Sequence, residues 1–145
     1  MFVQLSIGSA LIAATALVAA FSWLGLELIL IRTHHWAARP PFVLKLAFAL
    51  SLALVWSIMM VMASVGIWAL AFSMLHIFDN FEASIYFSLV AFTTLGFGDI
   101  LLPLEWRLLG GLAAANGLLI FGLLTAMLVE TLRQTRLRQR GVINK

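Results

Sequence analysis

Three long apolar runs, separated by short polar stretches, dominate the pattern of the chain. They extend from about residue 5 to 31, from about 46 to 75 and from about 108 to 132. Each run exceeds the roughly 20 residues that a helix needs to cross the hydrocarbon core of a bilayer. At 1.5 Å rise per residue the second run would be about 45 Å long, so it must tilt within a core of about 30 Å or protrude from it. The pattern therefore predicts three transmembrane helices.

A fourth apolar segment, Phe81 to Phe92, is too short to span a bilayer. Asp79 stands three residues ahead of Glu82, a spacing that predicts a capped helix start with negative charge at the positive end of the helix. We therefore expect a re-entrant helix. The glycine-containing residues after it are expected to be non-helical, and such backbone is tolerated at membrane depth only where protein buries it or water reaches it. This segment should line a pore.

The segment reads Thr93-Thr94-Leu95-Gly96-Phe97-Gly98-Asp99. A potassium ion that leaves water must exchange its hydration shell for fixed oxygens, and consecutive backbone carbonyls with one threonine hydroxyl can supply them. That backbone is unusually extended and twisted, and Gly96 and Gly98 permit it. Because one copy per chain cannot encircle an ion, we expect identical chains to close a ring around the axis.

Composition agrees with a membrane protein and excludes other classes. Hydrophobic residues make up 63% of the 145 residues and charged residues 10%, whereas soluble domains carry about 25% charged residues. The chain has room for one domain, and no polar stretch is long enough for an enzyme or a regulatory module. The absence of cysteine excludes disulfides, thiolate metal sites and thiol redox chemistry.

Basic residues predict the orientation in the membrane. They cluster between the first and second runs and after the third: Arg32, Arg39 and Lys45, then Arg133, Arg136, Arg138, Arg140 and Lys145. The positive-inside rule places both clusters in the cytoplasm, with the amino terminus outside and the basic tail beside anionic lipid. A cleaved signal peptide is not expected, because the first residues lack a basic side chain and the apolar run is too long. The outer loop is acidic and should concentrate cations; its acidic residues are Asp79, Glu82, Asp99 and Glu105.

From about Lys45 to Arg133 the chain resembles the pore module of tetrameric potassium channels, which has an outer helix, a pore helix, a filter and an inner helix. The filter differs from the commonest family version only in Leu95 for valine and Phe97 for tyrosine. Gly117 lies where the family often has a hinge glycine, and residues 121–126, FGLLTA, resemble a prokaryotic inner-helix pattern.

The resemblance implies a role for each filter residue. Backbone carbonyls of four residues would bind K⁺, and the first of the four would add its hydroxyl: Thr94, Leu95, Gly96 and Phe97. Thr93 and Gly98 would support these residues. Asp99 would sit behind and above the filter.

Two supporting positions depart from the family. Tyr86 and Phe87 stand where many members carry two tryptophans, and Val90 stands where some carry a glutamate that shares a proton or a water with the aspartate. That carboxylate pair is absent here, and Phe97 has no hydroxyl to donate. We therefore expect the support of the filter to rest on aromatic packing more than on hydrogen bonds.

The third run predicts a pore-lining face. Four residues at helical spacing are expected to line the cavity below the filter, with Gly117 as a hinge: Leu118, Phe121, Thr125 and Val129. Arg133 follows Glu130 by three residues. Because a ring of unpaired arginines would repel cations, we expect Arg133 to turn away from the axis, paired with Glu130 or anionic lipid, and to help hold a lower gate.

Other polar residues have a structural interpretation beside a functional one. Glu27 could be an ion or proton site, but its place near the cytoplasmic end favours a side chain that extends to the membrane surface. Asn116 is expected to hydrogen-bond between helices more than to bind an ion. His34 and His35 lack a third ligand at metal spacing, and His76 could sense external pH or simply end a helix.

The predicted protein is an all-α membrane protein with three transmembrane helices, a re-entrant pore helix and a filter loop. Its single membrane domain comprises an extra helix (5–31) packed outside the outer helix, a pore module (45–133) and a short basic tail (134–145). Without regularly spaced arginines in any run, no voltage sensor is expected. The expected function is passive K⁺ conduction by a homotetramer in the cell membrane, with K⁺ and lipids as partners and no nucleic acid.

Alternatives remain open at this point. The chain could be a weakly selective cation channel, or the pore or anchor subunit of a potassium-uptake transporter. The single, well-preserved pore loop argues against the transporter, whose loops would come from one longer chain with four imperfect repeats. A third alternative is a membrane scaffold, which would conduct no ions.

Overall fold

The computed structural model describes residues 1–32 and 41–143. In chain order its elements are α1 (Phe2–Arg32), α3 (Phe42–Met74), α4 (Phe81–Phe92), the short 3-10 helix η1 (Leu104–Trp106) and α5 (Arg107–Ile143). This described part of the chain is helical and contains no strand. The interpretations of His34, His35, Arg39 and Lys145 lie outside the described residues.

Three of the helices are long and apolar enough to cross a membrane, over Phe2–Ile29, Phe42–Met74 and Leu104–Leu137. The prediction of an all-α protein with three spans is confirmed, and α4 has the bounds expected of the short helix. The third helix is longer than predicted. α5 continues to Ile143, so the basic segment after residue 133 extends this helix, because its arginines, glutamines and leucines favour helical backbone.

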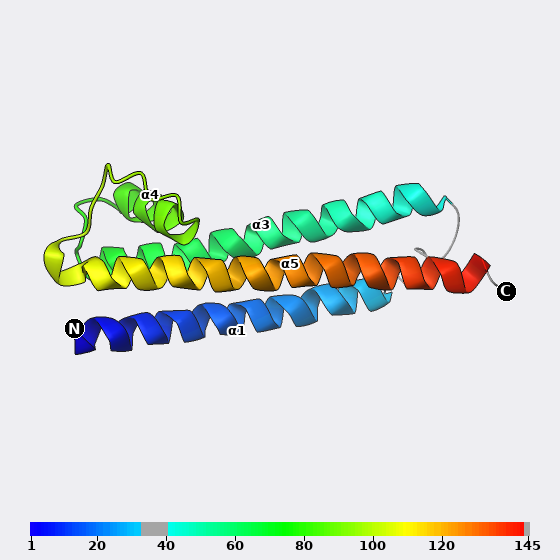
Figure 1. Cartoon of the computed structure of the whole chain (residues 1–145), viewed down its shortest axis with the longest axis horizontal. Coiled ribbons are helices and arrows are strands. Elements are labelled where there is room, and N and C mark those ends of the chain that lie inside the picture. Colours follow the sequence, from blue (N-terminus) through cyan, green and yellow to red (C-terminus); the bar gives the residue numbers. More distant parts are fainter. Residues whose placement is uncertain (33–40, 144–145) are drawn as a thin grey trace.

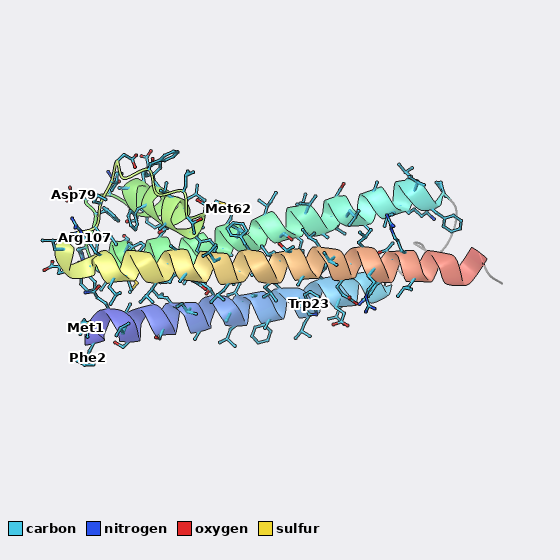
Figure 2. All side chains as sticks on the ribbon, viewed as in Figure 1. Met1, Phe2, Trp23, Met62, Asp79 and Arg107 are labelled. Carbon is cyan, nitrogen blue, oxygen red and sulfur yellow. The ribbon has the colours of Figure 1, made fainter. Side chains whose placement is uncertain are left out.

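The three long helices lie side by side, and α5 packs against both α1 and α3 (Figure 1). α1 and α5 run in the same direction, and α3 runs in the opposite one (Figure 1). α4 lies beside the end of α3 and the beginning of α5 (Figure 1). Figure 2 shows Met1, Asp79 and Arg107 at this end of the molecule. The short helix and its loop therefore share one end of the bundle with the N-terminus.

α1 packs against α3, as expected, but it also packs against α5, so its position is not only outside the outer helix. At Gly8 an added Cβ would lie 2.4 Å from Cδ1 of Leu112, which shows that the leucine side chain fills the space left by glycine. Farther along α1, Thr15 accepts a hydrogen bond from Asn116 of α5. Sequence could not place α1, because apolar residues surround this helix and its polarity marks no face.

The core lies where α3, α4 and the beginning of α5 meet. Trp68, Phe72 and Phe92 are fully buried there. The Phe72 ring packs edge-on against the rings of Phe78 and Phe87, with centroid distances of 6.3 and 5.4 Å. Edge-on aromatic pairs stabilise by about 0.5–1.5 kcal/mol beyond their buried area. This aromatic cluster fixes α4 against the outer helix α3.

α3 ends in a Schellman motif that turns the chain toward α4. His76, at φ 52°, holds the left-handed position; its amide donates to the Ser73 carbonyl at 3.0 Å, and the Ile77 amide donates to the Phe72 carbonyl at 3.1 Å. Histidine adopts this conformation more readily than most residues. His76 therefore ends a helix, as the structural interpretation of this residue predicted.

α4 begins at Asn80, whose side-chain oxygen accepts a hydrogen bond from the Ala83 amide at 2.7 Å. We predicted that Asp79 would cap this helix, and that assignment was wrong by one residue. A cap must reach the amide three residues ahead, and Phe81 is the first helical residue. Glu82 still lies in the first turn, where its negative charge suits the positive end of the helix.

Candidate functional site

The candidate filter begins as the cap of α4. Two amides beyond the helix donate back to its last turn, Thr94 to the Ala91 carbonyl at 2.9 Å and Leu95 to the Val90 carbonyl at 3.0 Å. This is a second Schellman motif, and its left-handed position, usually glycine, is occupied by Thr94 at φ 58°. The first two residues of the candidate filter are thereby joined to the end of the helix.

Left-handed residues alternate along the segment. Thr94, Gly96 and Gly98 have φ values of 58°, 59° and 78°, and the residues between them do not have positive φ. Glycine adopts this conformation freely, whereas a β-branched residue does so only under strain. An added Cβ at Gly96 or Gly98 would meet no atom within 4 Å. Backbone conformation, and not lack of space, therefore explains both glycines.

The segment from Thr93 to Asp99 lies on the surface of the chain. Its two large apolar side chains project outward, with 56% of Leu95 and 66% of Phe97 exposed. The Thr93 hydroxyl turns back and donates to the Leu89 carbonyl at 2.7 Å. A groove of about 310 Å³ separates the loop from α4 and from the beginning of α5; its lining includes Phe87, Val90, Thr94, Gly96 and Gly98.

One hydrogen bond holds the far end of the segment. The Tyr86 hydroxyl on α4 donates to Oδ2 of Asp99 at 2.5 Å. This bond favours the carboxylate and the neutral phenol, so it lowers the pKa of Asp99 and raises the pKa of Tyr86. We expected aromatic packing more than hydrogen bonds to support the filter, and did not foresee this hydrogen bond, in which the phenol reaches the aspartate across the loop.

The other two supporting residues face inward. Phe87 packs its ring against Phe72 and Phe78 at centroid distances of 5.4 Å. Val90, in place of the family's glutamate, is buried. Aromatic packing therefore supports the helix, as predicted, while the Tyr86 bond supports the loop.

Gly117 of α5 lies directly against the end of α4. An added Cβ there would be 1.8 Å from the carbonyl oxygen and 2.7 Å from the carbonyl carbon of Phe92. Both are backbone atoms that cannot rotate away. We expected Gly117 to line the pore as a hinge, but the structure gives this glycine a packing role, and the absence of a side chain lets two helix backbones touch.

The other inner-helix candidates share an exposed face. Leu118, Phe121, Thr125 and Val129 are all exposed in the single chain. The Thr125 hydroxyl donates to the Phe121 carbonyl at 2.9 Å. A groove of about 270 Å³ separates this part of α5 from α3, lined in part by Phe121 and Thr125. Their place along a pore stays a prediction.

A family model described as an ion channel matches residues 52–134 of the chain. The match covers more than half of the chain: most of α3, all of α4, the loop after it and α5 as far as Gln134. The chain belongs to this ion channel family. No curated protein and no solved structure matches the chain. The predicted resemblance to a channel pore module is confirmed, and α1 lies outside the matched region.

Near the end of α5 that is far from the candidate filter, Arg133 pairs with Glu130. The Arg133 Nε donates to Glu130 Oε2 at 2.8 Å and its NH2 group to Oε1 at 3.0 Å, and Gln134 also donates to Oε1 at 3.0 Å. The predicted pairing of Arg133 with Glu130 is confirmed. The contribution of Gln134 was missed, although its spacing of four residues from Glu130 could have indicated it.

Asn116 joins the channel's inner helix to the extra helix. Its side-chain amide donates to the Thr15 hydroxyl oxygen at 2.8 Å, and both residues are fully buried. The prediction of an interhelical hydrogen bond is confirmed. Glu27 lies in a small pocket between α1 and α5, beside Glu130 and Thr131.

Proposed function

We propose that the protein is a potassium-selective channel that conducts K⁺ passively through a central pore. The observation that carries this proposal is the alternation of left-handed φ at Thr94, Gly96 and Gly98. Alternation of hand turns successive amides toward one side of the backbone and successive carbonyls toward the other. A row of carbonyls can replace the hydration shell of K⁺. The ligands would be the carbonyls of Thr94, Leu95, Gly96 and Phe97 together with the Thr94 hydroxyl.

Four copies of the chain would form the pore. A single chain presents its filter carbonyls from one direction, whereas an ion needs oxygens around it. The exposed, non-helical backbone from Thr93 to Asp99 also needs cover at membrane depth, because such backbone is tolerated there only where protein buries it or water reaches it. A closed ring of identical subunits supplies both.

The surroundings of the filter favour cations. Asp99 accepts a hydrogen bond from Tyr86, which lowers the pKa of the carboxyl and so favours its charged form. The other acidic residues of the loop are exposed at the same end of the molecule: Asp79, Glu82 and Glu105. Negative charge at a pore mouth raises the local concentration of cations.

The orientation we propose has the N-terminus and the filter outside and the C-terminus in the cytoplasm of a cell membrane. The N-terminus and the pore loop share one end of the bundle (Figure 2), and the Gln4 side-chain amide donates to the Glu105 carbonyl there. The basic end of α5 then faces the cytoplasm, where it can contact anionic lipid.

Reversal potentials of purified protein in liposomes test this function. With K⁺ and Na⁺ exchanged across the membrane, the wild-type current should reverse near the potassium equilibrium potential. Gly96→Ala and Gly98→Ala should abolish the current and leave the tetramer intact, because alanine resists their positive φ. The matched control is Gly66→Ala in α3, where a Cβ meets no atom within 4 Å, and it should conduct normally.

A weakly selective cation channel is the second candidate. The observation that favours it is Phe97, which has no hydroxyl with which to fix the filter from behind. In the same experiment the current through such a channel would reverse midway between the equilibrium potentials of potassium and sodium. A scaffold or a transporter anchor would give no current from the protein alone.

A further inference from the structure

We propose that α1 positions the filter, acting through the buried hydrogen bond between Thr15 and Asn116. This inference rests on the proposed channel function and deepens it. α1 lies outside the residues that match the ion channel family, so it is an addition to the pore. α1 packs against α5 and α3, and α5 in turn touches the end of α4, from which the proposed filter starts.

The hydrogen bond between the two helices is specific in its direction. The Thr15 hydroxyl donates its proton to the Ile12 carbonyl at 2.9 Å, so its oxygen is free to accept the Asn116 amide at 2.8 Å. Both side chains are fully buried. Since a buried amide without a partner is costly, this bond fixes the position of α5 along α1, which apolar contacts alone would leave free to slide.

The residue after Asn116 transmits that position to α4. Gly117 lies about 100° farther around the helix than Asn116. At this level one face of α5 therefore contacts α1, and a second face, about 100° away, contacts α4. The contact between Gly117 and the Phe92 carbonyl involves backbone atoms only, and there is no flexible side chain to absorb a shift. Movement of α5 at Asn116 must therefore displace Phe92.

Displacement of Phe92 reaches the filter within one turn of helix. The neighbouring carbonyls of Ala91 and Val90 accept the amides of Thr94 and Leu95. These bonds hold Thr94 in its strained left-handed conformation. A sequence of direct contacts thus runs from Thr15 through α5 and α4 to the first ligands of the filter.

A second hydrogen bond ties α1 to the outer helix. The Trp56 Nε1 donates to Ser22 Oγ at 2.7 Å, with the Ser22 carbonyl at 3.2 Å. This contact lies two turns farther along α1 and does not involve α5. α1 is thereby held to α3 at one level and holds α5 at another.

Single-channel recording in planar bilayers tests the proposal. In Thr15→Val and in Asn116→Leu the ratio of closed to open time should rise about threefold, the factor expected for one interhelical hydrogen bond in a membrane. The double variant should show no larger change than a single one, because both remove the same interaction. Thr15→Ser keeps the hydroxyl and should behave as wild type.

Two further measurements separate filter positioning from general stability. Because K⁺ binds the conducting filter, raising its concentration should reverse the added closures by mass action. Ser22→Ala removes one α1 contact to α3 and leaves Trp56 with the Ser22 carbonyl, so its closed times should stay at the wild-type value. Size-exclusion chromatography should find a tetramer for every variant.

Wild-type closed times in both single variants would overturn the proposal, as would closures that K⁺ does not relieve. An equal effect of Ser22→Ala would show that α1 stabilises the subunit without positioning the filter. A variant that no longer forms tetramers is replaced by Thr15→Ala, which removes the same acceptor with a smaller side chain. Failure of the proposed channel function differs from failure of this inference, because the wild type itself would then show no selective current.

Discussion

Thr94 combines two roles that usually fall to different residues. As the left-handed cap of α4 it occupies a position where glycine is common. As a proposed ligand it needs its hydroxyl, which glycine lacks. The strain of such a conformation costs about 1–3 kcal/mol, and the two capping hydrogen bonds offset part of it. The filter therefore starts from a conformation that the end of the helix holds in place.

Tyr86→Phe tests the support at the other end of the filter. The substitution removes the hydrogen bond to Asp99, so the pKa of Asp99 should rise toward its ordinary value of 3.8. In the wild type the Asp99 carboxylate loses its charge only when the pH falls through its lowered pKa, which lies below 3.8. The variant should therefore lose potassium current at a higher external pH than the wild type.

Current recorded against external pH checks this expectation. Phe87 also lies on α4 but packs into the core, so the conservative variant Phe87→Leu serves as a control that should not move the acid limb. Identical pH profiles for Tyr86→Phe and the wild type would show that the phenol does not support the loop.

At the scale of helices, length and composition predicted most of the fold. The bounds of α4 followed from an apolar segment too short to span, and the three long runs became three long helices. The docking of α1 did not follow, because apolar residues around its whole circumference mark no face. The close contact of Gly117 with Phe92 also could not be predicted, since a glycine in a helix looks the same in the sequence whether the helix bends there or packs closely.

The candidate site was predictable in its positions but not in its bonds. The spacing of Gly96 and Gly98 indicated the unusual backbone between them. The capping role of Thr94 could not be predicted, because threonine rarely adopts positive φ. The Tyr86 bond depends on the path of the loop between Thr93 and Asp99, which no local pattern specifies.

Gly117→Ala tests the contact between the inner helix and α4. The new Cβ would overlap the Phe92 carbonyl, and overpacking of this kind typically costs about 1–3 kcal/mol. We expect a lower thermal midpoint of the tetramer and loss of potassium flux in liposomes. Gly111→Ala on the same helix meets no atom within 4 Å and should keep both properties. Wild-type stability of Gly117→Ala would contradict the packing role.

At the scale of the whole channel, charge is divided between two ends. Four of the six acidic residues lie in or beside the proposed filter loop, and basic residues follow the membrane-spanning part of α5. Arg133 is the first of these basic residues, and its pairing with Glu130 partly neutralises it. In the proposed tetramer four such pairs would surround the cytoplasmic entrance, so α5 helices can approach one another there without a ring of bare positive charge.

Arg133→Ala should change the open probability and its dependence on anionic lipid, with no change in the ratio of potassium to sodium permeability. The pair with Glu130 is exposed and contributes little by itself, so lipid should supply most of the effect. Single-channel recordings in bilayers with and without anionic lipid check this, with Arg136→Ala as a control for general loss of charge. Unchanged gating with sharply higher conductance would instead place Arg133 inside the permeation path.

The fixed position of Gly117 also shifts any bending of α5 to a lower level. Gly122 is the next glycine toward the C-terminus, and a Cβ there would meet no atom within 4 Å. From Gly122 to Arg133 the helix forms a lever arm of about 16 Å, so a tilt of about 10° would carry the entrance through about 3 Å. The part of α5 above this pivot would stay at rest. In the proposed channel, the cytoplasmic entrance would then widen or narrow while the coordination of ions at the other end stays undisturbed.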